Sequence, residues 1–286
     1  MLLGVHVSIA GHIYDAVTRA RELGCNVMQI FSRDPRQWRK ARISPEDARE
    51  FRRLRSEARI ERVFVHVPYL INLASPINIL YNSSIRGCIA DIKSADAIGA
   101  DYVVVHCGSH KKSGERSGIK RVASALDKIV EKTAACGVGI LLENTAGSGS
   151  WLGYEFSHQR KIMAKVADSR RVGLCLDTCH AFAAGYDLST REGLEKCLSE
   201  IDAEVGLEKL KLVHLNDCKS ALDSRRDIHE HIGKGSIGAA GMARIITDRR
   251  LANIPMILET PKDSEYADRK NLETVKRLRH GKRKDL

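Results

Sequence analysis

The 286-residue chain is predicted to belong to the α/β class and to fold as a TIM (β/α)8 barrel. Eight short apolar runs follow one another along the sequence, and helix-sized stretches separate them. Fully apolar runs of this length are typical of parallel strands buried on both faces. Seven of the eight runs end at a His, Glu or Asp. Because the carboxyl ends of barrel strands meet on one face, we expect the chemistry of the protein there.

The expected elements alternate regularly. In chain order, the apolar runs end at His6, Phe31, His66, His106, Glu143, Asp177, His214 and Glu259. The helices are expected at 13–23, 45–59, 77–98, 119–135, 157–167, 191–205, 239–247 and roughly 266–278. The helix from 45 has a clear start, since Ser44 is a good N-cap and Pro45 suits the first turn.

The segments that follow the strands are long, for example FSRDPRQWRKAR and DTCHAFAAGYD. Long loops on one face of a barrel commonly carry function, so we expect them to form the active-site and binding face. No linker or low-complexity stretch divides the chain, and residues 1–286 are expected to form one domain. Residues from about 280 to 286 are expected to be a mobile basic tail.

Composition limits the class of protein. No stretch approaches the roughly 20 apolar residues that cross a bilayer, and the start lacks the features of a signal peptide. We therefore expect a cytoplasmic protein, without a membrane partner and monomeric. The eight cysteines are scattered, which suits reduced thiols better than a disulfide framework.

The net charge of +11 favours a polyanionic partner. Between Arg33 and Arg62 there are eleven basic residues against six acids, and the chain closes with KRLRHGKRKDL. A solvated helix face and a frayed terminus are the simpler explanation for the tail. For residues 33–42, where Trp38 stands among arginines, contact with nucleic acid is favoured.

Nine potential metal ligands lie at the strand ends and in the loops after them. They are His66, His106, Glu143, Asp177, His180, His214, Asp227, His229 and Glu259. Imidazole and carboxylate without thiolate suit zinc or a similar divalent ion. In Asp227-Ile228-His229 an extended backbone sends both side chains to the same side. Nine ligands exceed one site, so two or three ions with a bridging carboxylate are expected.

A single histidine at a strand end is more often a hydrogen-bonded core or loop residue than a ligand. The convergence reverses these odds, because several carboxylates crowded at one barrel mouth would repel one another without a cation. His6 and His110 are candidates for lining the site, and His231 for supporting a ligand.

Several motifs are similar to those of the endonuclease IV family of apurinic/apyrimidinic endonucleases. They are ENTAG (143–147), DTCHAFAAGYD (177–187), HLNDCKS (214–220) and SRRDIHEHIGKGSIG (224–238), and RQWR (36–39) and YLINLASP (69–76) fit as well. The similarity extends from HVSIAG near the start to Glu259. It implies a barrel with three zinc ions that hydrolyses double-stranded DNA on the 5′ side of an abasic site. The products implied are a 3′-hydroxyl and a 5′-deoxyribose phosphate.

The resemblance also implies roles for individual residues. It implies that a first ion is held by His66, His106 and Glu143. Glu143 bridges to a second ion, which is held by Asp177, His214 and Glu259. The third ion is held by His180, Asp227 and His229. The catalytic carboxylates are then Glu143, which fixes the spacing of two ions, and Glu259, which orients the nucleophile. The positions that enter the minor groove and base stack are matched by Arg36, Tyr69 and Leu70.

Two other classes of protein remain open. A metal-dependent sugar isomerase or epimerase could use a similar barrel, but it has no need for RDPRQWR or the basic surplus. A DNA-lesion binding module with a structural metal cluster is also conceivable, although a structural zinc needs only four ligands.

Overall fold

The computed structural model describes residues 1–38 and 43–281 of the chain. Of the basic segment predicted to meet nucleic acid, Arg39, Lys40 and Arg42 lie outside the described residues. The same holds for residues 282–286, which make up most of the predicted tail.

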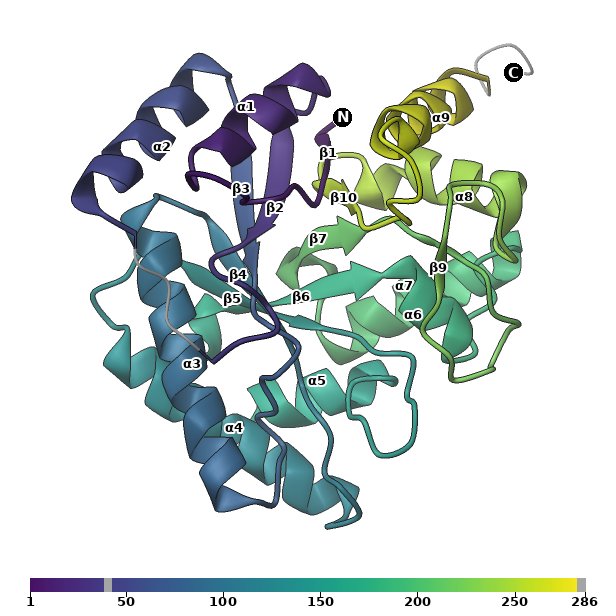
Figure 1. Cartoon of the computed structure of the whole chain (residues 1–286). Coiled ribbons are helices and arrows are strands. Elements are labelled where there is room, and N and C mark those ends of the chain that lie inside the picture. The colour runs from purple at the N-terminus through teal and green to yellow at the C-terminus, as the bar shows by residue number, and fades with distance from the viewer. Residues whose placement is uncertain (39–42, 282–286) are drawn as a thin grey trace.

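Eight parallel strands form a barrel at the centre of the molecule (Figure 1). They are β1 (Leu3–Val5), β2 (Val27–Phe31), β3 (Arg62–His66), β4 (Tyr102–His106), β5 (Gly139–Glu143), β6 (Val172–Asp177), β7 (Leu210–His214) and β10 (Met256–Leu258). Their order is β1-β10-β7-β6-β5-β4-β3-β2. A parallel bridge between His6 and Gln29 joins β1 to β2, and Val7 N donates to Gln29 O over 2.8 Å. These contacts close the barrel and confirm the predicted fold class.

Helices connect the strands and surround them (Figure 1). They are α1 (Asp15–Glu22), α2 (Pro45–Glu57), α3 (Asn78–Ala97), α4 (Glu115–Lys132), α5 (Phe156–Met163), α6 (Thr178–Ala183), α7 (Arg191–Glu204), α8 (Gly238–Thr247) and α9 (Ala267–Gly281). Short 3-10 helices occur at η1 (Ser169–Arg171), η2 (Leu207–Lys209) and η3 (Arg249–Leu251). The eight expected helices are present, whereas α6 and an antiparallel hairpin of β8 (Asp217–Cys218) and β9 (His229–Glu230) were not predicted.

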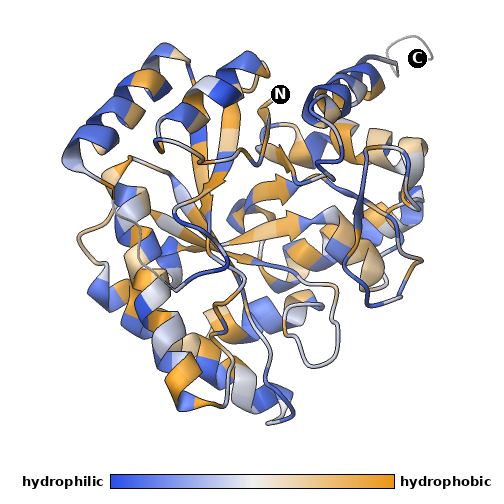
Figure 2. Ribbon diagram, viewed as in Figure 1, coloured by the Kyte–Doolittle hydropathy of each residue, from blue (hydrophilic) through white to orange (hydrophobic). Residues whose placement is uncertain are grey.

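Local chemistry explains several boundaries. Ser44 caps α2, since its Oγ accepts a hydrogen bond from Asp47 N at 3.0 Å, as its position before Pro45 predicts. The α9 helix extends to Gly281 and takes in His280, where the predicted tail was expected to start. Figure 2 shows the strands as the most apolar elements. The barrel interior holds a buried cluster of Val27, Phe64, Val104, Leu141, Cys175, Leu212 and Ile257.

Much of the basic surplus of residues 33–62 is neutralised locally. Arg33 is buried, and its Nε lies 2.8 Å from Asp91 Oδ1. Within the segment 33–42, this arginine is therefore not available for the predicted contact with nucleic acid. Its guanidinium forms a structural ion pair between the loop after β2 and α3. Arg53 pairs with two acids of its own helix. Arg36 also pairs with an acid, Asp34, but its side chain is 86% exposed and remains accessible to a partner.

The eight cysteines are free thiols, and seven of them are buried. Within residues 1–38 and 43–281, no helix has both the length and the apolar character that crossing a membrane requires.

Candidate metal centre

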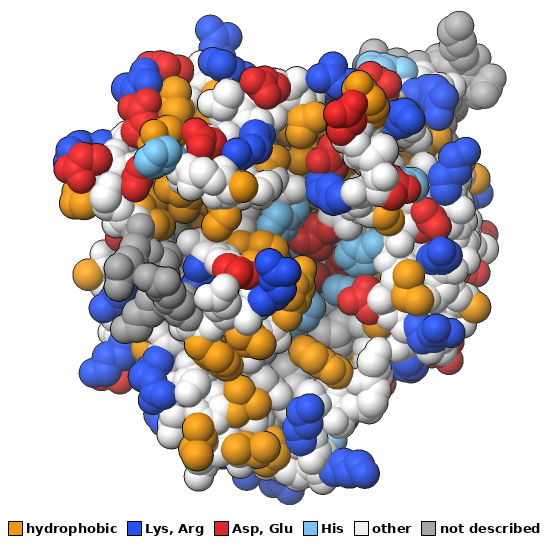
Figure 3. Space-filling model, in the orientation of Figure 1, with side chains coloured by type: hydrophobic (Ala, Val, Ile, Leu, Met, Phe, Trp, Pro, Cys, Tyr) orange, Lys and Arg blue, Asp and Glu red, His pale blue; other side chains and the backbone are white. Residues whose placement is uncertain are grey.

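The predicted ligands meet in a hollow at the carboxyl ends of the strands. Figure 3 shows histidine and acidic side chains gathered at the centre of this face. Strands β3, β4, β5, β6 and β7 each end in one of them, and Glu259 follows β10 directly. A cavity of about 260 Å³ is lined by Phe31, His66, Tyr69, His106, Glu143, His180, Asp227, His229 and Glu259.

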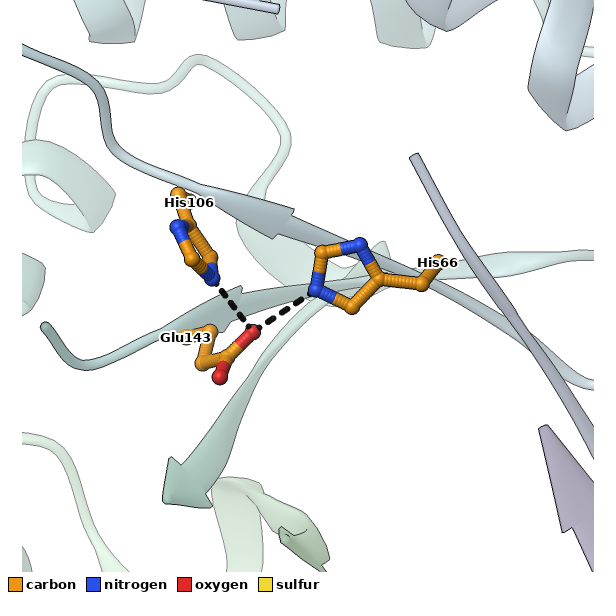
Figure 4. Close-up of side chains that lie close together, drawn as sticks. All are labelled: His66, His106 and Glu143. Carbon is orange, nitrogen blue, oxygen red and sulfur yellow. Dashed lines mark hydrogen bonds and ion pairs between the residues drawn. The ribbon is translucent and has the colours of Figure 1, made fainter. Parts of the chain in front are cut away.

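The first ligand group consists of His66, His106 and Glu143, which come from three adjacent strands (Figure 4). The Nε2 atoms of His66 and His106 lie 3.0 Å and 2.9 Å from Glu143 Oε2. One ligand atom from each residue lies within 4.8 Å of the others. The parallel register pairs His106 with Glu143, which places them side by side.

The second ligand group consists of Glu143, Asp177, His214 and Glu259. His214 Nδ1 lies 3.1 Å from Glu143 Oε1 and 3.2 Å from Glu259 Oε2. Asp177 Oδ2 is 4.0 Å from the same nitrogen. Glu143 therefore turns one carboxylate oxygen toward each of two groups, which is the arrangement of a bridging ligand.

The third ligand group consists of His180, Asp227 and His229. His180 Nε2 lies 3.0 Å from Asp227 Oδ2, and His229 Nε2 lies 3.3 Å from Asp227 Oδ1. The unpredicted elements place these residues. The α6 helix begins directly after Asp177 and carries His180, while the loop and strand of the β8–β9 hairpin carry Asp227 and His229.

Three of the five histidines also contact a backbone carbonyl through their other ring nitrogen. His66 Nδ1 is 2.6 Å from Val67 O, His180 Nδ1 is 2.9 Å from Asn144 O, and His229 Nδ1 is 2.9 Å from Glu259 O. A carbonyl can only accept, so each of these rings donates from Nδ1 and turns Nε2 toward the carboxylates. Ligating histidines are commonly held in this way.

The carboxylates of the site require positive charge around them. Burial alone would raise the pKa of Glu143, but His106, His214 and hydrogen bonds from His106 and His180 hold it well below its usual value. Burial likewise would lower the pKa of His229, yet Asp177 and Asp227 raise it to about 9. Without a metal, protonated imidazoles thus balance the acids. A divalent cation can supply the same positive charge, and the imidazoles that bind it are then neutral.

The donor set fits a metal in a second respect. His229 Nε2 is buried and makes no hydrogen bond among the described residues, although it faces Asp227 and Asp177. A buried polar nitrogen without a hydrogen-bond partner is costly unless something binds it. Imidazole nitrogen and carboxylate oxygen donors suit zinc.

Gln29 is a functional candidate that the sequence analysis missed. It is fully buried on β2, and its Oε1 lies 2.8 Å from His214 Nε2 while its Nε2 lies 2.6 Å from Glu259 Oε1. An amide oxygen accepts only, so His214 donates from Nε2 and presents Nδ1 to the second group. A glutamine inside the otherwise apolar run VMQIF is the signal that could have revealed it.

Asparagines also hold the second group in place. Asn144 Oδ1 accepts from Asp177 N at 2.6 Å, and Asn216 Nδ2 donates to Asp177 Oδ2 at 2.7 Å. Asn216 Oδ1 accepts in turn from Glu259 N at 2.8 Å. Asn144 directly follows β5 in the motif ENTAG, and Asn216 lies two residues after β7 in HLNDCKS. Their amides hold the backbone and side chain of Asp177 and the backbone of Glu259.

The predicted DNA-binding residues lie in the loops after β2 and β3. Tyr69 is 68% exposed, and its ring packs edge-on against Phe31 at 5.6 Å between centroids. Leu70 is half-buried, and Arg36 Nε lies 3.3 Å from Asp34 Oδ1. Tyr69 also lines a second cavity of about 280 Å³, whose walls include Ile71, Ala146 and Trp151 and whose floor reaches His66, His106, His180 and Asp227.

The three remaining histidine candidates differ in position. His6 Nδ1 lies 3.3 Å from Glu259 Oε1 and so contacts the second group. His110 Nδ1 accepts from Gly114 N within its own loop, and His110 lines neither cavity. His231 hydrogen-bonds with Asp263 and Asn271.

The fold and site correspond to a known class of proteins. A family model described as "Xylose isomerase-like TIM barrel" matches residues 17–281. A D-tagatose 3-epimerase-like protein superposes with a TM-score of 0.73 over 97% of both chains, but at 21% identity this likeness shows the fold alone.

More specific similarity comes from two other proteins. A probable endonuclease 4 of Halothermothrix orenii is 44% identical over 282 residues, which cover 98% of this chain and 99% of that protein. The crystal structure of endonuclease IV from Thermus thermophilus superposes with a TM-score of 0.88 at 35% identity, covering 97% of this chain and 98% of the other. The chain belongs to the endonuclease IV family. This membership confirms the resemblance that its motifs indicate, and the prediction that it is a nuclease.

Proposed function

We propose that this protein is a zinc-dependent endonuclease that hydrolyses the phosphodiester on the 5′ side of abasic sites in double-stranded DNA. The products are a 3′-hydroxyl and a 5′-deoxyribose phosphate, and the enzyme acts as a cytoplasmic monomer in DNA base excision repair. The observation that carries the proposal is the sharing of Glu143 between two ligand groups beside a third, in a member of the endonuclease IV family. Three groups correspond to three zinc ions.

The chemistry of hydrolysis divides between the ions and the chain. Zinc, when bound, acts as a Lewis acid on phosphoryl oxygens and lowers the pKa of water into the neutral range. Glu143 holds the first and second groups at a fixed separation through its two oxygens. We assign Glu259 the orientation of the attacking water, because its side chain is 19% exposed to the cavity whereas those of Glu143 and Asp177 are fully buried.

Recognition of the lesion uses the loops above the centre. A phosphate in a regular duplex cannot reach a recessed site, so the backbone must bend and the abasic sugar must rotate out. This costs least where base pairing is already lost. Arg36, Tyr69 and Leu70 offer a planar cation, an aromatic ring and an aliphatic wedge that can fill the vacated stack. The cavity between Tyr69 and Trp151 opens beside the first and third groups and can receive the sugar.

A metal-dependent sugar isomerase or epimerase is the alternative. The shared barrel is compatible with it, but one or two metal positions suffice for that chemistry, and the exposed Arg36 and Tyr69 have no part in it. A DNA-binding module with a structural cluster does not explain why Glu259 is open to a cavity.

The test uses an end-labelled duplex with one abasic analogue, a matched intact duplex, and a ketose as the competing substrate. We expect incision only of the abasic duplex, with loss of incision in chelator and recovery on adding zinc. The labelled fragment should carry a 3′-hydroxyl that a polymerase extends. Epimerisation of the sugar without incision, or metal-dependent DNA binding without any incision, would refute the proposal.

A further inference from the structure

Two cysteines lie next to the third ligand group without belonging to any of the three groups. Cys179 is on α6, two residues after Asp177, and Cys218 ends β8. Both side chains are fully buried, and the two thiols lie near each other. Neither thiol has a part in the proposed hydrolysis.

The hairpin brings these thiols to His229. Cys218 is the antiparallel partner of His229, so the two side chains lie on the same face of the hairpin. Cys179 packs beneath it, with Sγ 3.5 Å from the carbonyl oxygen of Ile228. One ligand atom each from Asp177, Cys179 and His229 lies within 4.8 Å of the others. Sulfur, nitrogen and oxygen donors therefore converge at a point between α6 and the hairpin.

We propose that Cys179, Cys218 and His229, with Asp177 beside them, form a separate site for a thiophilic cation such as Cd²⁺. Soft sulfur ligands select soft ions over the harder ions that carboxylates prefer. His229 Nε2, which is buried and makes no hydrogen bond in the described part of the chain, supplies the nitrogen. Each thiol that binds exchanges its S–H bond for a sulfur–metal bond, and protonated His229 exchanges its Nε2–H bond for a nitrogen–metal bond. Each exchange releases one proton to solvent, so no oxidant or reductant is required.

Occupation of this site competes with the centre described above. His229 belongs to the third group and Asp177 to the second, and one ring nitrogen cannot bind two ions. A cation held by the two thiols therefore removes a ligand from the third group. The binding itself does not depend on the proposed function, whereas its inhibitory effect does.

The experiment measures sulfur coordination directly and contains no DNA. Reduced, metal-stripped protein is titrated with Cd²⁺, and the sulfur-to-cadmium charge-transfer absorption is recorded in the ultraviolet. Wild type and Cys136→Ser should show the absorption, since Cys136 is the half-buried thiol between α4 and β5, away from these ligand groups. Cys179→Ser and Cys218→Ser should each reduce it, and the double variant should lose it.

Two outcomes would overturn the inference. One is absence of the absorption in wild type; the other is its retention in the double variant, which would assign it to Cys175, the β6 residue that pairs with Glu143. If the double variant does not fold, X-ray absorption of the wild-type Cd²⁺ complex decides, because a metal without sulfur neighbours contradicts the site. Failure of the proposed function would appear separately, as zinc-loaded wild type that does not incise abasic DNA.

Discussion

A single side chain, Gln29, holds two ligands of the second group at once. Replacing it with leucine removes the acceptor of His214 Nε2 and the donor to Glu259 Oε1. Loss of such supporting hydrogen bonds typically weakens metal affinity by about 10–100-fold. We expect Gln29→Leu to bind one metal ion per chain weakly and the others normally, as measured by competition with a chromogenic chelator.

The matched control is Gln159→Leu. Gln159 is also fully buried, but its amide donates to Gly153 O and contacts no ligand candidate. Equal metal affinities in the two variants would show that Gln29 has no special role in the second group.

Glu143 and His180 differ in how many groups they serve. Glu143→Ala removes the shared carboxylate of two groups, whereas His180→Ala removes one ligand of three. Since charge stabilisation by metal ions contributes several kcal/mol and about 1.4 kcal/mol is tenfold in rate, we expect a loss of roughly a thousandfold or more for Glu143→Ala. His180→Ala should lose less. Single-turnover incision of abasic DNA measures both, and equal rates in wild type and Glu143→Ala would contradict bridging.

The raised pKa of His229 predicts opposite pH responses with and without metal. Its folded-state pKa of about 9 exceeds the ordinary 6.5, so its contribution to metal-free stability is complete below 6.5 and is lost as the pH rises through 9. Metal binding requires the neutral imidazole and therefore strengthens over the same range. The difference in melting temperature between zinc-loaded and stripped protein should increase from pH 6.5 to 9. A constant difference would rule out this proton competition.

At the scale of elements, the loops after β2 and β3 are expected to read the lesion. The triple variant Arg36→Ala, Tyr69→Ala, Leu70→Ala removes the groups proposed to fill the vacated stack. Stacking on an aromatic side chain contributes about 1–3 kcal/mol, so binding to an abasic duplex should weaken roughly tenfold or more. Binding to an intact duplex should change little, and zinc content should stay the same. Equal weakening of binding to both duplexes would show that these residues only contact the DNA backbone and do not fill the vacated stack.

The strands could be predicted from the sequence because burial on both faces leaves continuous apolar runs, and six predicted ligands stand at or directly after the ends of such runs. The remaining structure around the site is built differently. The β8–β9 hairpin has only two residues in each strand, and α6 has a single turn or little more, so neither has a hydrophobic period to detect. These short elements depend on tertiary contacts, such as Cys179 against Ile228. The contacts of Gln29 with His214 and Glu259 could not be predicted, because they form only when β2 closes the barrel against β1.

At the scale of the whole molecule, we expect bound metal and the fold to stabilise each other. The ligand candidates stand at or directly after the ends of six barrel strands, on α6 and in the β8–β9 hairpin, so an ion that binds them links elements far apart in the sequence. Ligand at a thousandfold excess over Kd stabilises a protein by roughly 4 kcal/mol, and each kcal/mol shifts the melting temperature by about 2–4 °C at this size. Chelation should therefore lower the melting temperature by about 10 °C. Calorimetry with and without added zinc measures this, and an unchanged value would argue against metal binding by the folded state.

The circular order of the strands also sets the order in which a newly synthesised chain can assemble its centre. The first group is complete at residue 143, the midpoint of the chain, and the third at residue 229. The second waits for Glu259, which follows β10, the strand that inserts between β7 and β1. A nascent chain on the ribosome can therefore complete the second ligand group only when β10 is available to close the barrel. Until then, an ion bound by the first group lies in an incomplete barrel that lacks Glu259, the carboxylate assigned to orient water.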